Sequence, residues 1–332
     1  MSETISPPSF PVAFEATSSK INLVRNEIKK VIFGQDEVIE QTLVTLLSGG
    51  HMILLGVPGV AKTKLVSTLS KVLGLDSKRI QCSPDLMPSD LIGAEILEEV
   101  DYGRRNFRFV EGPLFCQFLM VDEINRASPR TQSALLQAME EECVTVTGRE
   151  HALPNPFHVL ATMNPLEHEG TYPLPEAQLD RFMMQIEIAY PSLEAERKVI
   201  TQTLEEKITP KSIIYASDLR EFQKTVTHMP LNDEGTNSIL NLVRAGRPTS
   251  TDLNEVKQYV SWGPGPRASL ALALAIRARA TLQGRSPPNA NDLSDMLAPV
   301  MRHRIALNYA ARADGITVDT ILARLAEKIQ KF

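Results

Sequence analysis

The sequence predicts an α/β fold with a mostly parallel sheet, followed by a second and mainly helical domain. Short apolar strands alternate with helix-length segments between residues 52 and 188, and a glycine-rich loop lies between the first strand and the helix after it. The chain has 332 residues, so one large domain and one smaller domain is the expected arrangement.

The composition is that of an ordinary globular protein. Hydrophobic residues make up 43% of the chain, charged residues 23% and aromatic residues 5%, which leaves few rings for stacking on bases. The net charge of −5 gives no overall attraction to nucleic acid or to an anionic membrane. The chain has no apolar run long enough for a membrane span and no secretion signal, and Cys82, Cys116 and Cys143 are expected to be buried free thiols. These features predict a cytoplasmic protein.

Five short apolar segments are expected to form the parallel sheet. They are residues 52–55, 80–82, 118–121, 159–162 and 183–188. Two helical patterns precede the first strand, at 21–32 and 38–47. Residues 1–18 are rich in Ser, Thr and Pro without periodicity, and are expected to form a flexible tail.

Two stretches interrupt the alternation of strands and helices. Residues 84–112 contain strand-like pieces around glycines and prolines, and residues 143–155 contain two more on either side of Gly148. Both stretches are expected to form hairpins. After Tyr190-Pro191 the strand signal fades, so the predicted division is a tail at 1–18, an α/β core at 19–191 and a helical domain at 192–332.

The loop after the first strand has the pattern of a phosphate-binding loop. Backbone N–H groups of such a loop converge on phosphate oxygens, while Lys62 reaches the terminal phosphates and the Thr63 hydroxyl coordinates Mg²⁺. The strict pattern has glycine before the lysine, and a helix-opening position is expected to tolerate Ala61 there. The residues expected to hold the nucleotide are Gly56, Val57, Pro58, Gly59, Val60, Ala61, Lys62, Thr63 and Lys64.

Polar side chains follow two later strands, where parallel strands of such folds bind ligands. Asp122 and Glu123 end the strand at 118–121: Asp122 is expected to hold Mg²⁺ through water, and Glu123 to polarise the attacking water. Asn164 follows the strand at 159–162 and is placed to orient that water. The sequence therefore predicts a nucleotide-hydrolysing site at this edge of the sheet.

Two arginines complete the candidate catalytic set. Arg181 lies just before the last strand, and Arg267 opens an Ala/Leu-rich helix after two Gly-Pro pairs. A guanidinium at the terminal phosphate stabilises transition-state charge. The helix dipole disfavours an arginine in the first helical turn, so Arg267 is expected to have an anionic partner.

These motifs, in this order, resemble those of the AAA+ ATPases and in particular the MoxR family. The stretches that carry the resemblance are Phe33-Gly34-Gln35, Gly49-Gly50-His51, 56–63, 84–91 (PDLMPSDL), 122–127 (DEINRA), 161–165 (ATMNP), 169–182 (EGTYPLPEAQLDRF) and 265–268 (GPRA). Together they cover residues 30–190 and one anchor in the helical domain. The resemblance implies a five-stranded parallel sheet of order 5-1-4-3-2, a C-terminal helical lid, a helix-2 insert at 84–112 and a pre-sensor hairpin at 143–155.

The resemblance also implies roles for single residues and partners. Asn164 looks like sensor 1, Arg181 like an arginine finger that acts on a neighbour's ATP, and Arg267 like sensor 2. Ile32, Phe33 and Gly34 look like the adenine-side wall. Proteins of this family form rings, so a hexamer that binds ATP and Mg²⁺ is expected. They act as chaperone-like motors on protein clients, often with a von Willebrand factor A domain protein.

Two alternatives remain open at the level of sequence. Arg104, Arg105 and Arg108 beside Phe107 in the first hairpin favour a nucleic-acid motor, whereas the acidic net charge and the lack of a DNA-binding module oppose it. A nucleotide switch with little turnover is the other alternative, and the intact Lys62, Glu123 and Arg181 argue against it.

Overall fold

The computed structural model describes residues 10–57, 59–100, 104–164, 170–205 and 208–329. Its centre is a five-stranded sheet of order β2-β5-β8-β1-β9, in which every adjacent pair is parallel. The strands are β1 (Met52–Gly56), β2 (Ser77–Gln81), β5 (Phe118–Asp122), β8 (His158–Met163) and β9 (Met184–Ile188). Numbered within the sheet, this is the order 5-1-4-3-2, so the predicted topology is confirmed.

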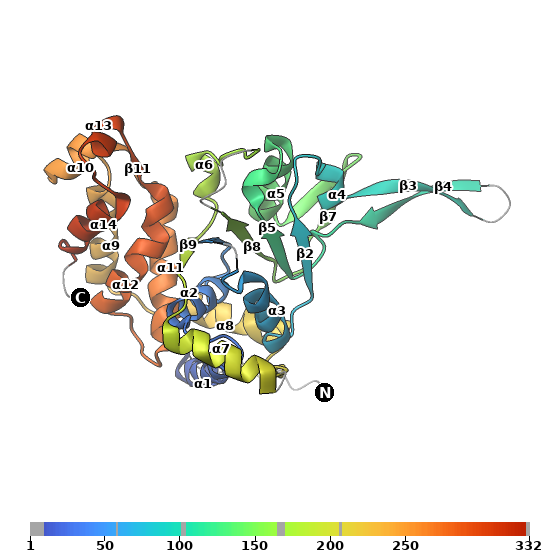
Figure 1. Ribbon diagram of the computed structural model, residues 1–332, viewed down its shortest axis with the longest axis horizontal. Helices are drawn as coiled ribbons and strands as arrows, with labels where there is room; N and C mark the ends of the chain where they lie inside the picture. Colours follow the sequence, from blue (N-terminus) through green and yellow to red (C-terminus); the bar gives the residue numbers. More distant parts are fainter. Residues whose placement is uncertain (1–9, 58, 101–103, 165–169, 206–207, 330–332) are drawn as a thin grey trace, which may run out of the picture.

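Helices cover both faces of the sheet (Figure 1). The helices in the first part of the chain are α1 (Phe10–Lys29), α2 (Asp36–Leu47), α3 (Lys62–Val72), α4 (Pro88–Ile92), η1 (Ile124–Arg126), α5 (Pro129–Glu141) and α6 (Glu176–Leu179). The later ones are α7 (Leu193–Glu205), α8 (Ala216–His228), α9 (Asp233–Ala245), α10 (Asn254–Tyr259), α11 (Pro266–Leu282), α12 (Ala290–Met301), η2 (Arg302–Arg304), α13 (Tyr309–Ala313) and α14 (Val318–Ala326). The predicted helical lid is therefore present, with one short antiparallel pair, β10 (Val260–Trp262) and β11 (Ala306–Leu307).

The sheet separates two apolar cores because successive side chains of a strand point to opposite faces. Met52 and Leu54 of β1 pack into the core that contains α1, α2 and α3, while Ile53 packs into the core that contains α5. All five residues of β5 are buried, which explains why this strand reads as a continuous apolar run.

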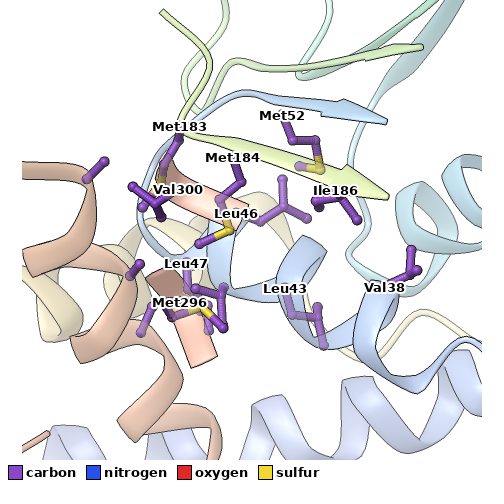
Figure 2. Close-up of a cluster of buried hydrophobic side chains, with 14 of the residues drawn as sticks. Val38, Leu43, Leu46, Leu47, Met52, Met183, Met184, Ile186, Met296 and Val300 are labelled. Atoms are coloured by element: carbon purple, nitrogen blue, oxygen red, sulfur yellow. The ribbon is translucent and has the colours of Figure 1, made fainter. Parts of the chain in front are cut away.

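The first core extends from the sheet into the lid. Figure 2 shows Leu46 and Leu47 of α2 beside Met184 of β9, with Met296 and Val300 of α12 completing the cluster. The lid is thus fixed to the sheet through α2. The apolar cluster is continuous across the predicted domain boundary at 191/192, and that boundary stays a prediction.

The prediction of a flexible tail over residues 1–18 is wrong for its second half, because α1 begins at Phe10. The side chains of Thr17 and Ser18 are buried, and the rings of Phe10 and Phe14 stack one helical turn apart at 6.0 Å. The buried face of α1 therefore extends toward the N-terminus through Thr17 and Ser18, small polar residues that hydropathy does not mark as core. Residues 1–9 lie outside the described part of the chain.

Both predicted hairpins are confirmed. The strands β3 (Gly93–Val100) and β4 (Arg104–Glu111) pair over their full length, and this hairpin projects from the end of the molecule opposite the lid (Figure 1). The strands β6 (Cys143–Val146) and β7 (Arg149–Ala152) form the second, shorter hairpin.

Candidate active site

A pocket of about 410 Å³ lies where the carboxyl ends of β1, β2, β5 and β8 meet the start of α3. Its lining brings together the predicted Lys62, Thr63, Asp122, Glu123 and Asn164. The full lining is Gly59, Ala61, Lys62, Thr63, Lys64, Arg79, Gln81, Asp122, Glu123, Thr162 and Asn164. Pro58, also predicted to contact the nucleotide, lies outside the described residues.

The phosphate loop has an unusual backbone at Ala61. This residue is the N-cap of α3 with φ 62°, in the left-handed region that side chains other than hydrogen disfavour. The position is therefore not the ordinary helix-opening one that the sequence suggested, and the strict pattern has glycine here for a conformational reason. The next residue, Lys62, donates from Nζ to the Gly56 carbonyl at 2.6 Å, so its ammonium lies across the loop.

Asp122 is held at the floor of the pocket and is only 7% exposed. Its Oδ2 accepts from Arg79 Nε at 2.6 Å, and its Oδ1 accepts from the Thr162 hydroxyl at 3.2 Å. Carboxylate and hydroxyl oxygens are the donors that Mg²⁺ takes in such sites, often with water between. Asp122 and Thr63 line one pocket, so the donor set fits Mg²⁺.

Glu123 is held from three sides. Its backbone lies in the left-handed region at φ 54°, and its N–H donates to Thr162 Oγ1 at 2.9 Å. Its Oε2 accepts from Gln81 Nε2 at 2.7 Å and from Arg126 at 3.1 Å. These two contacts fix the orientation of the Glu123 carboxylate, and that orientation decides whether the carboxylate reaches a water molecule. Gln81 and Arg126 therefore set the position of the candidate base.

Sequence reasoning missed Arg79, Gln81, Arg126 and Thr162. A signal for two of them existed. Arg79 and Gln81 are two residues apart at the carboxyl end of an outer strand, so both side chains lie on one face of the sheet, at the end of the strands where Asp122 lies.

A second pocket, of about 450 Å³, adjoins the first and shares Gly59, Ala61 and Lys64 with it. Its walls are mainly apolar: Val31, Ile32, Phe33, Gln35, Val60, Tyr190, Pro191, Glu196, Val199 and Ile200. Ile32 and Phe33 lie where the adenine-side wall was predicted. The opposite wall comes from α7 and the segment before it, which the sequence did not predict as part of the site.

Gly34 determines how closely α7 approaches this wall. It has φ +67°, and a Cβ atom placed on it would lie 2.4 Å from the Cβ of Ala195 in α7. Only glycine combines that backbone conformation with that contact. The absence of a side chain at Gly34 therefore lets α7 lie close enough to form the second wall of the apolar pocket.

The two predicted arginines lie together, and away from the phosphate loop. They line a third pocket, of about 300 Å³, with Gly50 and Met183, which precede β1 and β9. That is the amino edge of the sheet, whereas the phosphate loop follows β1, and the five residues of β1 alone span about 16 Å. The structure thus brings Arg181 to Arg267 but brings neither to Lys62.

Glu140, the last but one residue of α5, joins the two arginines. Its Oε2 lies 3.0 Å from an Arg181 nitrogen, and its Oε1 accepts from Arg267. The expectation that Arg267 has an anionic partner is confirmed. The sequence offered no signal for Glu140, because α5, α11 and the Arg181 turn meet only in the fold.

The turn that carries Arg181 is held to the lid by Arg304, whose side chain is 2% exposed. Arg304 donates to the Asp180 carboxylate at 2.7 Å and to the carbonyls of Asp180, Phe182 and Met183. His303 contacts the Phe182 carbonyl at 2.9 Å. Burial and the positive charge of nearby Arg267 lower the pKa of Arg304, while Asp180 opposes the shift.

Other site types have little support among the described residues. The three cysteines are free, and burial together with the carboxylates of Asp122 and Glu123 raises the pKa of Cys82 to about 12, so it is no thiolate nucleophile. No cluster of three His, Cys, Asp or Glu side chains there could hold a metal ion. None of the helices in that part of the chain is long and apolar enough to cross a membrane.

Comparison with known proteins gives concordant matches. Residues 51–184 match the family model "ATPase family associated with various cellular activities (AAA)", and residues 254–325 match the AAA lid domain. The chain is 42% identical to "Chaperone MoxR1" of Mycobacterium tuberculosis over 91% of its own length and 80% of that protein. It is 30% identical to "Protein MoxR" of Paracoccus denitrificans over 89% and 92% of the two chains. A solved structure of a "putative ATPase" from Cytophaga hutchinsonii superposes with a TM-score of 0.89 at 37% identity, covering 97% and 98% of the two chains.

Proposed function

The chain belongs to the MoxR family of AAA+ ATPases, and on that premise we propose that it couples Mg²⁺-dependent ATP hydrolysis to the remodelling or maturation of a protein partner. The observation that carries the proposal is the pocket in which Lys62, Thr63, Asp122 and Glu123 converge beside an apolar pocket of the size a base requires. The apolar walls bind adenine, and the loop binds the phosphates.

Five polar residues of the phosphate pocket have a role in hydrolysis. Lys62 leaves the Gly56 carbonyl for the terminal phosphates, since a charge-assisted bond to phosphate is stronger than one to a neutral carbonyl. Glu123 takes the proton of the attacking water, and Asn164 orients that water. Thr63 and Asp122 would hold Mg²⁺, which would supply positive charge that stabilises the phosphate oxygens.

The arginine pair acts on a neighbouring subunit's ATP in this proposal. Arg181 and Arg267 lie at the amino edge of the sheet and the phosphate loop at the carboxyl edge, so one subunit supports its neighbour's site when subunits pack head to tail. A closed ring, which we infer to be a hexamer, completes every site.

The β3–β4 hairpin is the proposed contact with the protein client. Its exposed apolar side chains include Leu97 and Phe107, which pair across the two strands and are 51% and 69% exposed. Exposed apolar groups on a projecting element are typical of protein contacts. A von Willebrand factor A domain protein is the proposed co-factor protein. The nucleic-acid alternative loses support, because Arg108 pairs with Glu98 at 3.0 Å.

The test is a Glu123→Gln variant used as a trap. It is expected to bind ATP as the wild type does and to lose hydrolysis by about 10²- to 10⁴-fold, because only the base is removed. Lys62→Ala serves as the contrast, since it should lose tight ATP binding as well. Calorimetry with ATP and a single-turnover assay measure the two quantities, and hydrolysis within about threefold of wild type excludes Glu123 as the base.

The same trap tests the client role. Affinity capture with Glu123→Gln should retain a protein client in the presence of ATP, and the added change Phe107→Ala should release it. Tyr309→Ala, an aromatic residue of the lid that is 86% exposed, is the matched control and should not. Stimulation of the ATPase by DNA but by no captured protein would favour the nucleic-acid motor instead.

A further inference from the structure

We propose that Arg181 and Arg267 form a phosphate-binding site that Glu140 occupies within the subunit, so that the carboxylate must release both arginines before they bind a neighbour's nucleotide. The inference rests on the proposed function for the source of that phosphate. It means that Glu140 competes with the neighbour's phosphate for the two arginines. In the unassembled subunit the arginines are then held by Glu140.

The geometry is that of one anion shared by two cations from different elements. Glu140 lies at the end of α5, Arg267 in the first turn of α11, and Arg181 in the turn before β9. Each carboxylate oxygen binds one guanidinium. A phosphate group offers the same pair of acceptor oxygens with more charge, so the two anions are alternatives for one place.

The pocket has room for the exchange. Its volume is about 300 Å³, and one water molecule takes up about 30 Å³ in the liquid, so a phosphate group fits with some of its hydration shell. All three side chains remain accessible: Arg181 is 31% exposed, Glu140 41% and Arg267 48%. An incoming ligand therefore reaches the pair without unfolding any element.

A second observation points to a missing acceptor. The Nε of Arg181 is buried and has no hydrogen-bond partner among the described residues. Glu140 contacts the neighbouring Nη2 of that guanidinium and leaves Nε without an acceptor in the part of the chain that the structure describes. A phosphate that binds Arg181 through two nitrogens satisfies the buried donor as well, which the single oxygen of Glu140 does not.

The local charges favour the exchange. Asp180 is neutralised by buried Arg304, which leaves Glu140 as the anion of the exposed pair. Two positive charges against one negative charge keep the site cationic, so it attracts a further anion. Ion pairs this exposed are each worth less than about tenfold in an equilibrium, so a phosphate carrying more charge displaces the carboxylate.

The first experiment measures the site without ATP chemistry. In a Lys62→Ala background, which disables the phosphate loop, inorganic tripolyphosphate is titrated into the protein and followed by calorimetry. Adding Glu140→Gln should tighten binding by roughly three- to tenfold, because two exposed ion pairs no longer compete. Adding Glu141→Gln should not, since Glu141 is exposed and its carboxylate accepts from Gln137 of the same helix. The gain should vanish when Arg181→Ala is included.

The second experiment measures the ATPase rate per subunit against protein concentration. With an intact Lys62, Glu140→Gln should reach half of its maximal rate at roughly a third of the wild-type concentration or less, while Glu141→Gln follows the wild type. An unchanged curve together with unchanged tripolyphosphate affinity overturns the proposal. So does a fall of the maximal rate at an unchanged midpoint, because Glu140 would then hold the arginines in their productive position.

The two experiments separate this proposal from the proposed function. If Arg181→Ala and Arg267→Ala both keep the wild-type ATPase rate, the arginines do not act on a neighbour's ATP, and the proposed function fails at that point. The tripolyphosphate titration still decides whether Glu140 competes for an anion site.

Discussion

Two residues of the phosphate pocket have left-handed backbones although neither is glycine. Ala61 has φ 62° and Glu123 has φ 54°. Each costs about 1–2 kcal/mol relative to a relaxed conformation. Such strain persists where the surrounding structure fixes it, and here both strained residues line the pocket proposed for the phosphates.

Ala61→Gly should therefore stabilise the protein. Glycine adopts positive φ without the Cβ clash, so the free energy of unfolding should rise by about 1 kcal/mol in urea denaturation. Ala310→Gly is the control, because Ala310 is exposed within right-handed α13 and the same substitution there should cost about 1 kcal/mol. Equal losses at both positions would show that Ala61 is not strained.

At the scale of elements, α7 connects the nucleotide pocket to the part of the chain that continues into the lid. It lines the apolar pocket with Val199 and Ile200, which are 41% and 63% exposed, and it rests on Gly34 through Ala195. Bound adenine would cover these side chains. The position of α7 and the affinity for the base are thus linked.

Gly34→Ala should weaken base binding more than phosphate binding. The new methyl group collides with Ala195 and displaces α7, so the dissociation constant for ATP should rise by about tenfold or more, the loss of roughly one good apolar contact. Inorganic tripolyphosphate, which needs only the loop, should bind within about twofold of wild type. Gly315→Ala is the matched control, with φ +69° and no atom within 4 Å of the added Cβ. Equal effects on ATP and tripolyphosphate would exclude this role of α7.

Some parts of the fold and of the site could be predicted from the sequence and others could not, for physical reasons. The apolar runs at 118–121 and 159–162 are buried on both faces, so their type and the polar residues at their ends could be inferred. The two arginines could be found from their motifs. Their partner Glu140 and the α7 wall could not, because those contacts join elements that meet only through the topology.

At the scale of the whole molecule, buried histidines link stability to pH. The Val159 N–H donates to His51 Nδ1, so His51 Nε2 carries the proton and donates to the Met139 carbonyl at 3.1 Å. His158 contacts the Gly50 carbonyl through Nδ1 at 2.9 Å. Burial lowers the pKa of His51 to about 3 and that of His158 to about 4, and it holds the pKa of His303 well below its usual value.

Stability should fall as the pH drops below about 6.5, the pKa of histidine in the unfolded chain. Above that value both states are neutral, and below it the unfolded state binds protons first, so each histidine removes up to about 1.4 kcal/mol per pH unit until its folded pKa is reached. Urea denaturation at pH 7 and pH 5 measures the difference. His158→Gln should reduce the slope and exposed His228→Gln should not; a slope that ignores His158→Gln contradicts the assignment.

Mixing two inactive variants tests the head-to-tail arrangement. A Lys62→Ala subunit has a dead site but intact arginines, and an Arg181→Ala subunit has the reverse. Under conditions of subunit exchange the mixture should recover at most about a quarter of the wild-type rate, since one ordered pairing in four rebuilds a site. Because Arg267 lies beside Arg181, Arg267→Ala should be rescued by Lys62→Ala as well. No gain above the separate rates, despite demonstrated co-assembly, places both arginines outside the neighbour's site.

The phosphate loop and the arginine pair lie at opposite edges of one sheet, and this has a consequence for counting sites. In a linear string of subunits, one end always presents a nucleotide without arginines and the other presents arginines without a nucleotide. The fraction of idle sites shrinks as the string grows, and it reaches zero only when the ends join. Under the proposed function, ATP turnover per subunit is then a direct measure of ring closure, and a substance that blocks one exposed end keeps the ring open and leaves one site idle in each assembly.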